Sequence, residues 1–83
     1  MNNRLFVGNL PYPATKADLE VLFDKIGLVS SIEIVCDRRS QSQGYAFVTV
    51  SNESEAERAI EALNGHTLRV QGAERNLYVS LAK

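Results

Sequence analysis

The sequence contains one cysteine, one histidine and no tryptophan among its 83 residues. Cys36 alone cannot form an internal disulfide, and one cysteine with one histidine at an unrelated position does not make a zinc site. No apolar run approaches the roughly 20 residues that span a bilayer or has the pattern of a signal peptide. We therefore expect a soluble, intracellular protein with no metal, cofactor or membrane partner, cytoplasmic in a bacterium and nuclear or cytoplasmic in a eukaryote.

Low-complexity segments and runs rich in proline, glycine or serine are also absent, so the sequence offers no linker or disordered arm. A chain of this length has room for one hydrophobic core. With 45% hydrophobic and 23% charged residues, the composition is ordinary for a globular protein. We expect a single domain over residues 1–83.

Hydrophobic periodicity predicts four strands and two helices in the order β-α-β-β-α-β. Alternation with a period of two predicts strands over residues 4–10, 29–36, 44–50 and 76–81. Apolar residues at helical spacing predict helices over residues 15–26 and 53–63. The segment between the second helix and the last strand is expected to be a weak strand or a loop.

Capping residues mark the expected helix ends. Thr15 and Asp18 have the spacing of a capping box at the start of the first helix, and Gly27 is expected to end it. Ser54 and Glu57 have the same spacing at the start of the second helix. That helix is expected to end at residues 64–65, an Asn-Gly pair.

This order of elements predicts a ferredoxin-like α+β sandwich. A four-stranded antiparallel sheet would carry both helices on one face, because the two crossovers are right-handed. The other face would then stay open to solvent. Strand residues of one parity supply the sheet's share of the core, and they are Leu5, Val7, Ile32, Ile34, Ala46, Val48, Val50, Leu77 and Val79.

Aromatic residues occupy the opposite parity. The open face would carry Phe6, Tyr45, Phe47 and Tyr78. An exposed apolar patch of this size usually marks a binding site in a soluble protein. The alternative is a register shifted by one residue, which would bury the rings and expose the aliphatic residues. It requires the same error in two separate strands.

Two stretches of the sequence, LFVGNL and QGYAFVTV, resemble the two signature motifs of the RNA recognition motif family. The octamer pattern is matched at residues 44–48 and missed at Gln43 and Val50. The hexamer resembles the family at every position, and the resemblance covers essentially the whole chain. It implies a module that binds single-stranded RNA, or single-stranded DNA, and has no catalytic activity.

The resemblance also implies roles for individual residues. Phe6 and Phe47 would each stack a base, Tyr45 would lie against sugars, and Gly8 would keep the surface open. Gln43 stands where the family usually has Lys or Arg, so one phosphate contact would be weakened. The other positions implied in contacts with bases or phosphates are Asn9, Arg38, Arg39, Ser80, Ala82 and Lys83. Tyr78 is an additional ring on the open face, which would either contact a base or flank the platform.

Charges are segregated although the net charge is only −1. The expected helices hold three basic and seven acidic residues, whereas strands and loops hold six basic and three acidic residues. The basic residues thus concentrate on strands and loops, and some of them border the open face. With few of them, we expect binding to depend on stacking more than on phosphates and to have a shallow salt dependence.

A protein-interaction domain of the same fold, with weak or no RNA binding, is the main alternative. Family members of that kind often use an Arg-x-Phe motif before the last strand, but this loop reads VQGAERN. The acidic helix face remains a candidate surface for other proteins. An acylphosphatase-like enzyme is a third class, but the loop GNLPYPAT lacks the arginine that would cradle phosphate, and His66 has no recognisable catalytic partner.

Overall fold

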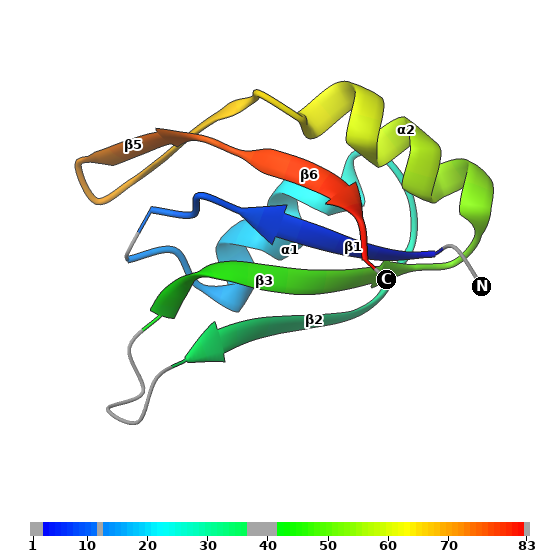
Figure 1. Cartoon of the computed structure of the whole chain (residues 1–83), viewed down its shortest axis with the longest axis horizontal. Coiled ribbons are helices and arrows are strands. Elements are labelled where there is room, and N and C mark those ends of the chain that lie inside the picture. Colours follow the sequence, from blue (N-terminus) through cyan, green and yellow to red (C-terminus); the bar gives the residue numbers. More distant parts are fainter. Residues whose placement is uncertain (1–2, 12, 37–41, 83) are drawn as a thin grey trace.

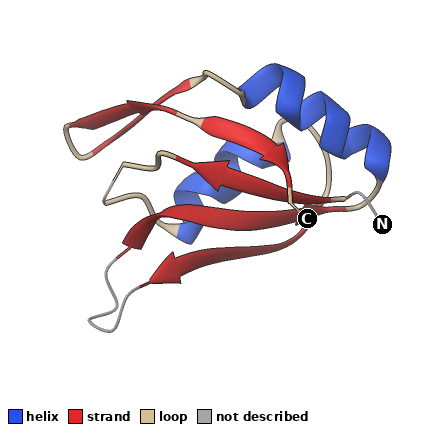
Figure 2. Ribbon diagram, in the orientation of Figure 1, coloured by secondary structure: helices blue, strands red, loops and turns tan. Residues whose placement is uncertain are grey.

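The computed structural model describes residues 3–11, 13–36 and 42–82, with the side chains of residues 36, 42 and 43 excluded. The strands and helices follow in the order β1 Arg4–Gly8, α1 Lys16–Asp24, β2 Val29–Cys36, β3 Ser42–Val50, α2 Glu53–Leu63, β4 Thr67–Val70, β5 Ala73–Asn76 and β6 Tyr78–Leu81 (Figure 1). Strands β2, β3, β1 and β6 form one antiparallel sheet in that order. Both helices lie behind this sheet (Figure 2), which confirms the expected ferredoxin-like α+β sandwich.

The core lies between the sheet and the helices. Phe23 and Leu19 of α1 and Leu63 of α2 are buried there. Every strand residue predicted for the core is buried, except Ile34, which is half-buried beside it. The predicted parity of the strands is therefore correct, and the register shifted by one residue is excluded.

The first helix begins as predicted and ends earlier. The Thr15 hydroxyl oxygen accepts from the Asp18 amide at 3.3 Å, and the Thr15 amide donates to Asp18 Oδ2 at 2.8 Å. The helix ends at Asp24 with Lys25 as C-cap, so the prediction that Gly27 is the C′ residue is wrong. A Cβ atom at Gly27 would lie 2.6 Å from Cδ of Glu55, so a side chain there would displace the flexible end of Glu55.

The second helix begins at a different cap from the one predicted. Asn52 is the N-cap, and its Oδ1 accepts from the Glu55 amide at 2.9 Å. The predicted box of Ser54 and Glu57 is wrong by two residues, since Asn, like Ser, is a strong N-cap and stands earlier in the sequence. The Ser51 hydroxyl donates to the Glu55 carboxylate and lowers the pKa of that group. At the other end, Gly65 has φ +85°, which agrees with the predicted C′ glycine.

The segment expected to be a weak strand or a loop forms a regular hairpin. Strands β4 and β5 pair with each other as a separate two-stranded sheet. Gln71 and Gly72 between them both have positive φ, as a type I′ hairpin turn requires. Its strand pattern is weak in sequence because only Leu68, Val70 and Ala73 are partly buried and the rest is exposed. Across the described ranges, neither helix has the length and apolar character needed to cross a membrane.

Candidate nucleic-acid interface

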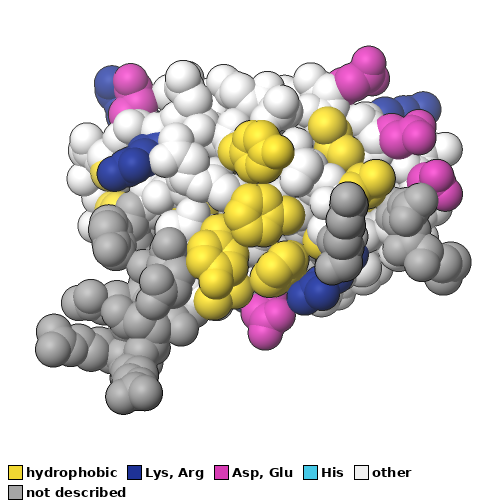
Figure 3. Space-filling view, in the orientation of Figure 1, with side chains coloured by type: hydrophobic (Ala, Val, Ile, Leu, Met, Phe, Trp, Pro, Cys, Tyr) yellow, Lys and Arg dark blue, Asp and Glu magenta, His cyan; other side chains and the backbone are white. Residues whose placement is uncertain are grey.

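The open face of the sheet carries a patch of four rings, Phe6, Tyr45, Phe47 and Tyr78, called the aromatic patch below. In the strand register, Phe6 lies opposite Phe47, and Gly8 lies opposite both Tyr45 and Tyr78. Hydrophobic side chains gather at the centre of this face, over β6, β1 and β3, with charged side chains around the margin (Figure 3). Tyr78 is 55% exposed, and the other three rings are half-buried.

Phe6 is the centre of the patch. Its ring centroid lies 5.6 Å from that of Tyr45, 5.9 Å from that of Phe47 and 6.2 Å from that of Tyr78. The planes of Phe6 and Tyr45 differ by 32°, whereas Phe47 stands at 65° to Phe6 and at 88° to Tyr45. The rings of Phe6 and Tyr45 are thus tilted by 32° to each other, and Phe47 stands at a steeper angle to both.

Gly8 makes the position of the Phe6 ring possible. A Cβ atom at residue 8 would lie 2.8 Å from Cε2 of Phe6, closer than such contacts occur. Gly8 has the same parity on β1 as Phe6, so a side chain there would project into the aromatic patch. The absence of a side chain leaves room for the ring between the two strands that carry the tyrosines.

A charged pair borders the patch at Phe47. The guanidinium carbon of Arg4 lies 4.2 Å from the centroid of the Phe47 ring, a cation–π contact. Nη2 of the same guanidinium lies 3.8 Å from Oε1 of Glu33, which stands directly opposite Phe47 on β2. One face of Phe47 is therefore already covered, and a base can stack there only if Arg4 moves.

Asn9, which follows β1, forms two side-chain hydrogen bonds with the β4–β5 hairpin. Its Nδ2 donates to the Asn76 carbonyl at 2.8 Å, and its Oδ1 accepts from Nη1 of Arg75 at 3.0 Å. The residue has φ +58°, a left-handed conformation that asparagine tolerates better than most residues. Asn9, which was predicted to contact RNA, thus also positions β5. Its hydrogen bond to Arg75 holds that side chain beside the end of β1.

The remaining predicted site residues divide into two groups. Ser80 lies opposite Phe6 on β6 and is half-buried, and the Ala82 amide donates to the Arg4 carbonyl at 2.9 Å. Arg38, Arg39, Lys83 and the side chain of Gln43 lie outside the described residues.

Three charged residues near the patch were not predicted as site residues: Arg4, Glu33 and Arg75. The signal for the first two was present in the parity of their strands, because Arg4 shares the face of Phe6 and Glu33 lies on the face opposite to the core residue Ile32. Their meeting over Phe47 depends on the register of three strands and is not visible in the sequence.

The part of the chain that the structure describes holds no group of three or more His, Cys, Asp or Glu residues that could bind a metal ion. His66 is exposed, and its backbone bonds to Leu63 and Leu77 in the turn after α2. The interface is therefore built from rings, backbone and a few charged side chains.

The chain matches the model of the RNA recognition motif over residues 5–71. It is 44% identical over 66 residues to the 28 kDa ribonucleoprotein, chloroplastic, of Spinacia oleracea, covering 78% of this chain and 28% of that protein. It is 42% identical over 85 residues to the protein of the same name from Nicotiana sylvestris, covering 90% of this chain and 31% of the relative. The chain thus spans less than a third of the length of these curated relatives.

A solved structure of another protein is also similar to this chain. A structure described as an Sxl-lethal protein/RNA complex has a TM-score of 0.89 and 38% identity, covering 100% of this chain and 48% of that chain. The two relatives are named as chloroplast proteins, a compartment that differs from the cytoplasmic or nuclear location predicted from the sequence, which stays a prediction. On this match over most of its length, the chain belongs to the RNA recognition motif family.

Proposed function

We propose that this chain binds single-stranded RNA on its open sheet face, mainly by stacking bases on the aromatic patch. The observation that carries the proposal is the group of rings around Phe6, with centroids 5.6 to 6.2 Å away. Rings on a flat surface that no helix covers offer the π-faces on which bases stack. Membership of the family, the ribonucleoprotein relatives and the neighbour solved with RNA support the same function.

Individual roles follow from the ring geometry. Phe6 would stack one base, and Tyr45 would support the adjoining sugar or base because its ring centroid lies 5.6 Å from that of Phe6. Tyr78 would extend the surface across β6, and Gly8 would keep it open. Phe47 would stack a second base once Arg4 has left its ring. Contacts with base edges or phosphates would come from Asn9, Arg38, Arg39, Gln43, Ser80, Ala82 and Lys83.

Replacement of Phe6 by alanine tests the proposal. The loss of one stacking surface should weaken binding of short single-stranded RNA by about 1 to 3 kcal/mol, which is roughly 5- to 150-fold. Val21→Ala is a matched control, because Val21 is 64% exposed on α1, on the helix side of the sheet. Fluorescence anisotropy with labelled oligonucleotides measures the affinity, and circular dichroism verifies the fold. A folded variant lacking both Phe6 and Phe47 that binds as tightly as the wild type would eliminate the proposal.

Single-stranded DNA offers the same π-faces but lacks the 2′-hydroxyl that distinguishes RNA. Titration with DNA and RNA of one sequence separates the two ligands. Equal affinities would assign the binding to stacking alone, and a preference for RNA would indicate contacts with the ribose.

A further inference from the structure

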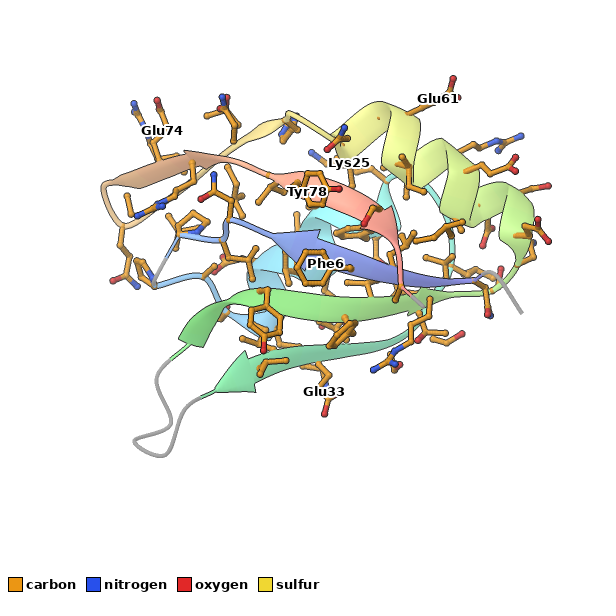
Figure 4. The ribbon with its side chains drawn as sticks, viewed as in Figure 1. Phe6, Lys25, Glu33, Glu61, Glu74 and Tyr78 are labelled. Carbon is orange, nitrogen blue, oxygen red and sulfur yellow. The ribbon has the colours of Figure 1, made fainter. Side chains whose placement is uncertain are left out.

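Arg4 and Glu33 form a small polar site around the face of Phe47 that the Arg4 guanidinium covers. The guanidinium lies 4.2 Å from the ring centroid, and its Nη2 lies 3.8 Å from Oε1 of Glu33. In Figure 4, Glu33 projects from β2 at the edge of the sheet, and the labelled rings of Phe6 and Tyr78 lie on β1 and β6, on the other side of β3. One aromatic face, one carboxylate and one flat cation thus occupy the same corner of the candidate interface.

The pair is loose. A distance of 3.8 Å is too long for a hydrogen bond, and the side chains of Arg4 and Glu33 are 49% and 72% exposed. Exposed ion pairs and exposed cation–π contacts contribute little, and stacking of a base on an aromatic ring is stronger. A base can therefore displace the guanidinium from Phe47 at small cost.

The chemistry of the displaced group indicates which base fits best. The guanidinium is flat, lies against the ring and presents N–H donors toward a carboxylate that can only accept. A base that takes its place must also be flat and must direct adjacent N–H groups at Glu33. Guanine has this arrangement in its N1–H and 2-amino groups, which belong to a guanidine-like unit within the base.

We propose that the face of Phe47 is a guanine-selecting position, at which the base displaces the Arg4 guanidinium and donates two hydrogen bonds to the Glu33 carboxylate. This inference rests on the proposed RNA binding and specifies its base preference. Charge-assisted bidentate hydrogen bonds are among the strongest polar contacts in proteins and depend on geometry. Arg4, once displaced, keeps all five of its donors for a neighbouring phosphate.

The other bases fit Glu33 less well. Adenine and cytosine present one amino group beside a ring nitrogen that accepts, so the second carboxylate oxygen would face an acceptor. Uracil presents a single N–H between two carbonyl oxygens. The expected order of affinity is guanine first, adenine and cytosine next, and uracil last.

The ordinary explanation of Glu33 is a charged residue that protects an edge strand from pairing with other chains, because β2 is at the edge of the sheet. That role requires only a charge. It predicts no effect of Glu33 on the choice between bases, so base selectivity distinguishes the two explanations.

The experiment compares short RNA oligonucleotides with a uridine background in which the central positions carry guanine, adenine, cytosine, uracil or inosine. Wild-type protein should prefer guanine over uracil by about tenfold, as expected for one bidentate contact. Glu33→Gln, which replaces one acceptor oxygen by a donor, should bring the guanine and uracil affinities to within about twofold while RNA is still bound. Arg4→Ala should keep the preference, because the carboxylate remains.

Inosine provides the sharpest control, because it is guanine without the 2-amino group. Exchange of guanine for inosine should weaken binding several-fold in the wild type and hardly at all in Glu33→Gln. Binding of all oligonucleotides with equal affinity, or a guanine preference that survives in Glu33→Gln, would overturn the inference and leave the proposed RNA binding intact. If the wild-type protein binds none of the oligonucleotides, both the guanine preference and the proposed RNA binding are overturned.

Discussion

A Cβ atom on Gly8 would lie 2.8 Å from Cε2 of Phe6, so the central ring of the aromatic patch keeps its place only because residue 8 lacks a side chain. Gly8→Ala should therefore displace the Phe6 ring and weaken RNA binding by about 1 kcal/mol, part of the value of one stacked base. The fold should be retained, since a half-buried ring on an open face can rotate. Titration of RNA combined with chemical shifts of the Phe6 ring measures both effects. An unmoved ring with lower affinity would show that Gly8 acts in another way.

Asn9 is expected to hold the β4–β5 hairpin against the end of β1. Asn9→Ala removes both of its side-chain hydrogen bonds and also places alanine at φ +58°. Asn9→Gly is the matched variant, because glycine adopts this conformation freely and lacks the side chain. Loss of the two exposed hydrogen bonds should destabilise the hairpin by about 1 kcal/mol and accelerate amide exchange in residues 67–76 in both variants.

The difference between Asn9→Ala and Asn9→Gly gives the backbone strain alone. If amide exchange in the hairpin stays as slow in Asn9→Gly as in the wild type, the hairpin is held by its own turn and not by Asn9.

The cap of α2 can be located by mutation. Asn52→Ala should reduce the free energy of unfolding by about 1 kcal/mol, because the Glu55 amide loses its acceptor. Ser54→Ala, at the cap predicted from the sequence, should change it by less than about 0.5 kcal/mol, because Ser54 is exposed in the first turn. Urea unfolding followed by circular dichroism gives both values, and the opposite ranking would restore the capping box of Ser54 and Glu57.

Salt should affect RNA binding only moderately. The basic residues predicted or observed near the interface are Arg4, Arg38, Arg39, Arg75 and Lys83. If all of them contact phosphates, log K against log salt has a slope of about −3.5, since single strands contribute about −0.7 per contact. We expect a shallower slope, because Arg75 already donates a hydrogen bond to Asn9 within the protein. A slope near −10, typical of strongly basic binders, would contradict a mode dominated by stacking.

Strand parity explains why the core and the aromatic patch could be predicted from the sequence. Tyr45 and Phe47 alternate with Ala46 and Val48, and a period of two forces these pairs onto opposite faces wherever the strand lies. Helix coverage of one face then decides which pair is buried. The same local logic predicted the Thr15 cap, because its partner is only three residues away.

Other features depend on residues that are far apart in the sequence. Asn9 meets Asn76 and Arg75 across more than 60 positions, and Arg4 meets Phe47 and Glu33 only because β1, β3 and β2 pair in one register. No short stretch of sequence predicts these contacts. The hairpin of β4 and β5 was also underestimated, because a half-exposed strand has a weak hydrophobic alternation.

The sequence by itself thus determined which side chains lie in the core and which on the open face, since alternation along a strand is a local property of the backbone. Only the tertiary structure decided how the exposed side chains meet. It set the tilt of Phe47 against Phe6, the Arg4 guanidinium over Phe47 and the carboxylate of Glu33 beside it. These relationships require the lateral order and register of the strands, which long-range backbone pairing fixes and no short stretch of sequence contains.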